Sequence, residues 1–328
     1  ALVFGAIAIA ILDVAANMAM QPFKMMIGDM VNDEQKSYAY GIQSMLSNSG
    51  AVIAAFFPFL LTVLGVANTA KKGVVPQSVV ISFYVGATIL VITSLLTVTK
   101  VHEYDPKTYA RYHGIKEEDN KEGGNWFELL KKAPKVFWQV SLVQLFCWFS
   151  FQYLSTYATG AIAENVWKVT DPSSAGYQLA GNWFGVLTAV QSIAAVIWSY
   201  VLAKVPNDHH KVGYGISLLL GAIGYGSIFF IHSQNILIVS FILIGISWAA
   251  MNTYPLTMVS NALSGKHMGT YLGLFNCSIC LPQIIASLLS FILFPLMKYS
   301  MPAMMLTAGI SGILAAVCVL FIKETYKN

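Results

Sequence analysis

Residues 76–99 read PQSVVISFYVGATILVITSLLTVT, a stretch without a single charged side chain. An apolar run of roughly 20 residues is long enough to cross the ~30 Å hydrocarbon layer of a bilayer as a helix. A helix also satisfies its own backbone hydrogen bonds, which lipid cannot do, whereas the strand of a membrane barrel would be far shorter. The stretch therefore predicts a transmembrane helix and an all-α fold.

The same apolar pattern recurs along the whole chain. Hydrophobic residues make up 56% of the 328 residues and charged residues only 10%, whereas a soluble domain carries about 25% charged residues. The pattern predicts a membrane protein with nine spans, each bounded to within several residues. The spans cover residues 1–30, 37–65, 76–99, 135–162, 178–204, 211–232, 235–263, 267–297 and 301–323.

The basic residues predict the orientation, because short positively charged loops stay in the cytoplasm. With residues 100–134 inside, 15 of the 19 lysines and arginines fall on the cytoplasmic side. The C-terminus is then cytoplasmic, and we expect a plasma membrane or a bacterial inner membrane. The formal net charge of +4 is small, and no basic arm is interleaved with aromatic residues, so we expect no nucleic-acid partner.

A faint internal repeat indicates two related halves. Pro22 and Gly41 are 19 residues apart, and Pro255 and Gly273 are 18 apart. A proline kink in one span, followed by a small residue early in the next, is what a parallel duplication of six-helix halves leaves. On this reading three helices precede Ala1. The expected architecture is the twelve-helix major facilitator fold, with nine of the twelve helices present and the N-terminal three missing.

The predicted halves meet at a polar segment. Residues 100–134 replace the apolar pattern with charged residues, tyrosines and a glycine pair. Near the end of the segment, residues 126–132 (WFELLKK) predict a short amphipathic helix along the membrane surface. We therefore expect residues 1–99 to hold the last three helices of an N-terminal bundle, residues 100–134 to be a cytoplasmic linker, and residues 135–328 to form the C-terminal six-helix bundle.

One polar stripe lies in the first span. Asp13 is the only carboxylate deep within a predicted span, where an unpaired charge costs a few kcal/mol. Asn17, Gln21 and Lys24 follow at steps of 4, 4 and 3, so the four share one helix face. The stripe is either a seam that joins helices or a wall of a substrate cavity. The second reading predicts that all four residues bind substrate, and that Asp13 carries the coupled proton.

A second stripe follows the linker, where Gln144, Trp148 and Gln152 recur at steps of four. Amides that donate and accept, beside flat aromatic faces, suit a hydroxyl-rich ligand such as a sugar. A single aromatic residue can equally face lipid or the core. The weaker candidates for substrate contact are Gln43, Asn252, Asn276 and Gln283. Each of them can instead form a hydrogen bond that holds two helices together. Asn48 and Gln191 are further intramembrane polar residues of this kind.

The sequence predicts no metal site, no cofactor and no enzyme. All four cysteines fall in apolar runs, and we expect buried free thiols. Cys277 and Cys280 have a zinc-like spacing, but no second Cys or His pair accompanies them. The spans contain no facing pair of carboxylates and no nucleophile beside a base, so catalysis is not expected.

Residues 12–29, LDVAANMAMQPFKMMIGD, resemble the fourth helix of the sucrose transporters and their animal and bacterial relatives. These proteins are glycoside-cation symporters of the major facilitator superfamily. Leu-Asp-Val-Ala, Asn-Met, Pro and the closing Asp keep the family's spacing. Gly273, Asn276 and Pro282-Gln283 are similar to that family's eleventh helix. The resemblance implies the major facilitator fold, and it makes Asp13 the protonation and sugar-binding residue.

The chain also departs from that family. Lys24 stands where relatives usually have Arg, Ala16 replaces an Asn, and Tyr157 lies where relatives often carry an acid. Maltose or another glucosyl disaccharide is therefore as good a candidate as sucrose. We expect a monomer in the bilayer that imports a small glycoside by proton symport with alternating access. The alternatives are a sodium-coupled glycoside symporter and a sugar receptor of the same fold that does not transport.

Overall fold

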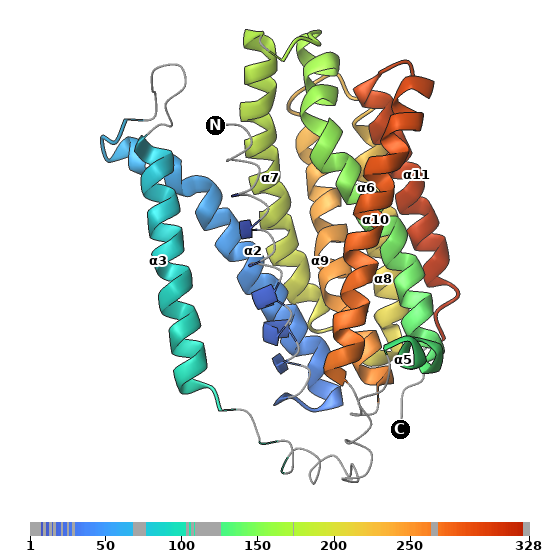
Figure 1. Ribbon diagram of the computed structural model, residues 1–328. Helices are drawn as coiled ribbons and strands as arrows, with labels where there is room; N and C mark the ends of the chain where they lie inside the picture. The colour runs from blue at the N-terminus through green and yellow to red at the C-terminus, as the bar shows by residue number, and fades with distance from the viewer. Residues whose placement is uncertain are drawn as a thin grey trace.

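A computed structural model describes residues 8, 11, 12, 15, 18–20, 22–24, 26, 27, 30–67, 77–102, 105, 108, 126–172, 174–263 and 268–323. Every regular element in this part of the chain is a helix, so the predicted all-α fold is confirmed. The long helices of the bundle run side by side along one direction, as helices that cross one bilayer do (Figure 1).

The long helices are α2 (Asp33–Val63), α3 (Gln77–Lys100), α6 (Lys135–Ile162), α7 (Ala175–Leu202), α8 (His210–Ser227), α9 (Leu237–Ala262), α10 (Met268–Leu296) and α11 (Met301–Val319). The short elements are α5 (Trp126–Lys132), the π turn η2 (Ala163–Trp167) and the 3-10 turn η3 (Asn207–His209). Each long helix corresponds to one predicted span, and α6 has the predicted bounds. The short helix expected after the polar segment is present as α5.

Five helices of the described part are long and apolar enough to cross a membrane by length and composition alone: α3, α7, α9, α10 and α11. Helices α2, α6 and α8 carry more polar side chains, such as Asn48 in α2 and Gln144 and Gln152 in α6. Polar residues within a span face the interior of a bundle, because exposing them to lipid costs free energy. The less apolar helices are therefore the ones expected to line an interior.

Helices α6 to α11 pack into one bundle. Helix α6 lies against α10 and α11, α8 lies against α9 and α11, and α7 lies against α9. Small residues let the backbones approach: a Cβ added to Gly309 of α11 would lie 2.8 Å from the Gly226 backbone of α8. Helix interfaces in membranes are commonly built from such small residues, because lipid supplies no hydrophobic drive for helix association.

The buried side chains of this bundle form two clusters. One joins the helix halves nearest α5 and contains Phe137, Tyr254 and Phe275. The other joins the opposite halves and contains Tyr153 and Phe241. The middle of the bundle lies between these clusters, and it is the level at which the candidate site is found.

Helices α2 and α3 lie beside the bundle. Helix α2 packs against α7 and α9, and α3 packs against α2 (Figure 1). In the figure α2 lies close to α9 near the end of the bundle that carries α5, and it leans away toward the other end. The most apolar stretch of α3 has no buried residue. The assignment of α2 and α3 to a second six-helix bundle stays a prediction, as does the orientation in the membrane.

Some helix ends differ from the predicted bounds for local reasons. Helix α8 ends at Ser227 rather than near residue 232. The Asn165 side chain of η2 donates from Nδ2 to the carbonyl oxygens of Ile228 at 2.8 Å and Phe229 at 3.2 Å. These carbonyls would otherwise need donors from a continuing helix, so a side chain from another segment stabilises the helix end.

Candidate functional site

Three aromatic rings meet at the middle of the bundle. Trp148 and Phe151 lie about one turn apart on α6, and Trp248 comes from α9. Phe151 stacks on Trp248 with 4.4 Å between ring centroids, and Trp148 meets the two rings edge-on at 5.7 and 5.8 Å. All three side chains are half-buried, so each keeps some exposed surface.

Polar groups border these rings on the α10 side. Gln152 follows Phe151 on α6, and its Nε2 donates to Ser287 Oγ of α10 at 3.3 Å and to Thr156 Oγ1 at 3.4 Å. Both bonds are long for this type of contact, and both hydroxyl partners are exposed. The amide can therefore exchange these hydroxyls for those of a ligand. Trp148 Nε1, in contrast, is buried without a hydrogen-bond partner among the residues the structure describes.

The rings are also joined to α2. Trp248 Nε1 donates to Asn48 Oδ1 at 3.0 Å, and Asn48 Nδ2 donates in turn to the Ser44 carbonyl at 2.7 Å. Asn252, one turn after Trp248, donates from Nδ2 to the Trp248 carbonyl at 2.8 Å. A ring that faces the candidate site is thus held by a residue of the helix outside the bundle.

A line of polar contacts continues this junction along the first half of α2. Asn48 is its last member, and the others lie closer to the end of the molecule that carries α5. They are Lys36 Nζ to Ser260 O at 3.4 Å, Ser37 Oγ to His210 Nε2 at 3.1 Å, and Ser44 Oγ to Ser199 Oγ at 3.0 Å. Buried polar contacts of this kind hold helices together at a fixed register.

Gly41 sets the closeness of that contact. A Cβ added to Gly41 would lie 2.7 Å from Cβ of Ala203 at the end of α7, closer than two carbon atoms can approach. Gly273, which the sequence repeat pairs with Gly41, has no atom within 4 Å of an added Cβ. In the second half of α2, Ile53 and Val63 are 67% and 68% exposed. The bundle is therefore closed against α2 at one end.

Gln144 lies deeper in the protein than the rings. It is only 2% exposed, and its Nε2 donates to the Met251 carbonyl of α9 at 3.2 Å. Its Oε1 is buried without a hydrogen-bond partner in the described part of the chain. Of the second predicted stripe, Trp148 and Gln152 thus border the open side, while Gln144 lies in the packing between α6 and α9.

The other described candidates lie on α10, on α2 and in the segment before α2. On α10, Gln283 donates to the Ile279 carbonyl at 3.0 Å, and Asn276 Nδ2 lies 3.9 Å from Cys280 Sγ. Gln43 is half-buried on α2. The Lys24 carbonyl accepts a hydrogen bond from Tyr40 Oη of α2 at 3.3 Å.

The first predicted stripe falls mainly outside the described residues. Asp13, Asn17 and Gln21 all lie there, and of the four members only Lys24 is described. Their roles in binding substrate, and that of Asp13 in carrying a proton, stay predictions from the sequence.

Trp248, Thr156 and Ser287 of this arrangement were not predicted from the sequence. A signal for Trp248 was present, because it precedes Asn252 by four residues and so lies on the same helix face. Ser287 likewise follows Gln283 by four residues, and Thr156 follows Gln152 by four. Periodicity places each pair on one face, but only the tertiary packing shows which faces meet.

No metal centre is evident in the part of the chain that the structure describes. Within the described residues no three His, Cys, Asp or Glu side chains group closely enough to hold an ion. The expectation of buried thiols was right for Cys147 but wrong for Cys277 and Cys280, which are exposed on α10, and Cys318 is half-buried.

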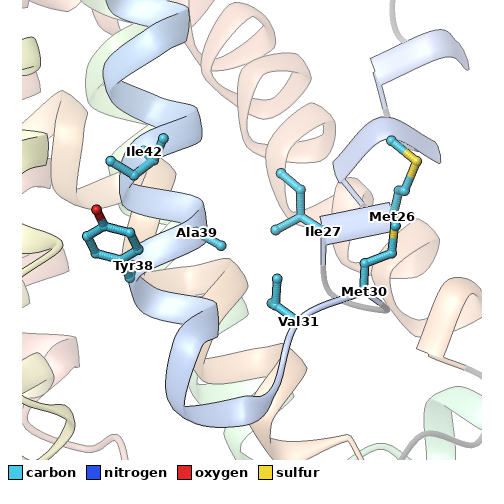
Figure 2. A pocket seen from close by; sticks show the side chains of 7 residues that line it. All are labelled: Met26, Ile27, Met30, Val31, Tyr38, Ala39 and Ile42. Atoms are coloured by element: carbon cyan, nitrogen blue, oxygen red, sulfur yellow. The ribbon is translucent and has the colours of Figure 1, made fainter. Parts of the chain in front are cut away.

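A cavity of about 370 Å³ lies elsewhere, between α2 and the segment before it (Figure 2). Its lining is almost wholly apolar, and the residues that line it are Met26, Ile27, Met30, Val31, Tyr38, Ala39 and Ile42. A hydroxyl-rich ligand needs several convergent hydrogen-bonding groups, which this lining does not offer. The aromatic and amide cluster at the middle of the bundle is therefore the better candidate site.

Comparison with known families gives one result. A family model described as Major Facilitator Superfamily matches residues 2–287 and, in a second alignment, residues 170–328. No curated protein matches the chain significantly.

Proposed function

Because the chain belongs to the major facilitator superfamily of membrane transporters, we propose that it is a secondary active transporter that imports a small glycoside together with protons. The superfamily accounts for the multi-span helical fold and for transport as the general activity. The glycoside and the proton are our proposals, and each is supported by different residues of the chain.

The observation that carries the glycoside proposal is the cluster of Trp148, Phe151 and Trp248 beside Gln152. A pyranose ring has one apolar face and a rim of hydroxyls. Aromatic rings cover the apolar face, and an amide donates to and accepts from the hydroxyls. The hydroxyls of Thr156 and Ser287, which are exposed and accept from Gln152, add further polar groups beside the rings.

The position of the cluster fits a transport mechanism. Substrate sites of secondary transporters lie near the middle of the bilayer, where one bundle rocks against the other. The cluster lies midway along α6 and α9, and Trp248 is bonded to Asn48 of α2. With the orientation predicted from the basic residues, the contacts from Lys36 to Asn48 close the cytoplasmic side, and a sugar would enter from the outside.

The proton proposal rests on Asp13 in the sequence. A carboxylate within a membrane span is costly when charged, so it takes up a proton readily from the more acidic side. Protonation together with sugar binding would then allow the closed end to open, and loss of both would reset the protein. Residues Asn17, Gln21 and Lys24 would complete the opposite wall of the sugar site.

Uptake by the full-length protein in vesicles tests the proposal. Labelled maltose and sucrose are offered under an inward proton gradient, an inward sodium gradient, or neither. We expect proton-driven uptake of at least one sugar, with a KM about tenfold higher in Gln152→Ala, since one hydrogen bond to substrate contributes about 1.5 kcal/mol.

A matched control is Gln178→Ala, which removes an amide that bonds the Pro172 carbonyl far from the rings. This variant should transport as the wild type does. Uptake driven only by the sodium gradient would show that sodium, and not the proton, is the coupling ion. Binding of sugar without uptake under any gradient would favour a receptor, and an unchanged KM in Gln152→Ala would remove the proposed site.

A further inference from the structure

Four lysines gather at one edge of the bundle, where α5 meets α6 and α11 ends. Lys131, Lys132 and Lys135 are all exposed and follow one another through the short turn between α5 and α6. Lys323 joins them from the other end of the chain, since its backbone N–H donates to Gln139 Oε1 of α6 at 3.1 Å. Glu128 is the one carboxylate among the described residues of this edge.

The helix that presents the first two lysines is firmly attached. Leu129 of α5 is only 8% exposed and belongs to the core cluster of the nearer half of the bundle. Its carbonyl accepts a hydrogen bond from Tyr271 Oη of α10 at 3.0 Å. Helix α5 lies at the end of the bundle, at the level where the long helices end (Figure 1), and Lys131 and Lys132 are exposed on it.

The end of α11 is fixed in the same region by another lysine. Lys211 Nζ donates to the carbonyl oxygens of Leu320 at 2.8 Å and Ile322 at 2.9 Å. The Lys211 ammonium group thereby caps the C-terminal end of α11. The position of Lys323 beside Gln139 thus follows from two separate attachments, and its own side chain remains exposed.

Apolar side chains continue from the lysines toward the middle of the membrane. Trp138 and Leu142 lie one turn apart on the outer flank of α6 and are 51% and 45% exposed. Leu320 and Phe321 at the end of α11 are 70% and 62% exposed. Tryptophan favours the interface between headgroups and acyl chains. The edge therefore offers positive charge, then an interfacial aromatic ring, then aliphatic surface.

We propose that this edge, formed by Lys131, Lys132, Lys135 and Lys323 with Trp138 and Leu142, binds an anionic phospholipid. The ammonium groups would neutralise the phosphate of the headgroup, and the apolar side chains would contact its acyl chains. Basic residues at the membrane surface recognise anionic lipids in this way. The predicted orientation faces this edge toward the inner leaflet. The proposal does not depend on the transported substrate.

Native mass spectrometry of the full-length protein, titrated with phosphatidylglycerol or phosphatidylcholine, tests the assignment. We expect preferential retention of phosphatidylglycerol. The triple variant Lys131→Gln, Lys132→Gln, Lys135→Gln should raise its dissociation constant by about tenfold or more. The triple variant with arginine at the same positions should retain binding within about threefold, because arginine also pairs with phosphate.

The matched control removes three exposed lysines elsewhere: Lys100→Gln, Lys168→Gln, Lys298→Gln. This variant carries the same net charge and should bind phosphatidylglycerol as the wild type does. Equal retention of the two lipids, or equal weakening in both glutamine variants, would overturn the proposal. Displacement of the lipid by inorganic phosphate, with no effect of Trp138→Gln on lipid binding, would show a site for a free anion instead.

Discussion

The indole N–H of Trp248 in α9 donates to the side-chain oxygen of Asn48 in α2 at 3.0 Å. The same indole ring stacks on Phe151 at 4.4 Å. One side chain therefore belongs both to the candidate sugar site and to the contact between α2 and the bundle. A ligand that moves this ring would alter the contact, which gives a physical route from binding to opening.

The first prediction concerns Trp248→Phe, which keeps a ring on Phe151 but removes the donor. Asn48 Oδ1 would lose its hydrogen-bond donor, which costs about 1–2 kcal/mol. The population in which the closed end is open should therefore rise about fivefold or more. The measurement is the alkylation rate of Ser44→Cys in a background without the native cysteines. Trp198→Phe is the control, because Trp198 Nε1 bonds Ser217 Oγ at 2.9 Å inside the bundle. Equal acceleration in both variants would contradict the role given to Trp248.

The second prediction compares two glycines that the sequence repeat makes equivalent. Gly41→Ala places a methyl group 2.7 Å from Ala203 Cβ, and such overpacking costs about 1–3 kcal/mol. Gly273→Ala meets no atom within 4 Å and should stabilise its helix by up to about 1 kcal/mol. The unfolding temperature should fall in Gly41→Ala and rise slightly in Gly273→Ala, and only Gly41→Ala should speed alkylation at the closed end. A stable, closed Gly41→Ala protein would show that the contact with Ala203 is not tight.

The third prediction concerns Lys211→Met. Removing the ammonium group leaves the carbonyls of Leu320 and Ile322 without their donor. Since each charge-assisted bond contributes about 1.5 kcal/mol or more, and Lys211 is partly exposed, we expect a loss of about 1–2 kcal/mol. Thermal unfolding in detergent measures it. Lys100→Met, at the exposed end of α3, should leave the unfolding temperature unchanged, and an equal loss there would refute the capping role.

The fourth prediction concerns pH and Glu164 in η2. Burial raises the pKa of the Glu164 carboxyl above its ordinary value, although a hydrogen bond from the Met301 backbone opposes the rise. The folded state therefore binds the proton of the Glu164 carboxyl group more tightly than the unfolded state does. The contribution to stability is complete below the ordinary pKa of glutamic acid and is lost as pH rises through the raised value. Unfolding temperatures should fall over this pH range in the wild type and less in Glu164→Gln; identical profiles would contradict the shift.

Much of the fold could be predicted from the sequence, because a membrane span is defined mainly by its length and apolar composition. Residues 135–162 were predicted to the residue as α6, and 235–263 became Leu237–Ala262 of α9. The end of α8 was not predictable, because it depends on the Asn165 side chain of η2, which is 63 residues from Ile228 in the sequence. The pattern of neighbouring residues in the sequence cannot predict a contact between segments so far apart.

The candidate site was predictable only in part. The spacing of Trp148 and Gln152 placed them on one face of α6, and the structure brings that face against α9 and α10. Trp248 was missed because a tryptophan in an apolar run is compatible with lipid, core or cavity. Gln144 shares the same spacing, yet it is buried on the Met251 carbonyl. A helical period of 3.6 residues leaves a face about 100° wide, and tertiary packing decides which part of it is open.

The most direct test of proton-coupled glycoside transport is the external pH of weakly buffered proteoliposomes that contain the full-length protein, recorded when maltose or sucrose is added. We predict a rise in external pH that follows sugar uptake. In Asp13→Asn the rise should be absent, while exchange of labelled sugar across the membrane continues. Sugar accumulation without any pH change in the wild type, or an unchanged pH signal in Asp13→Asn, would contradict the account.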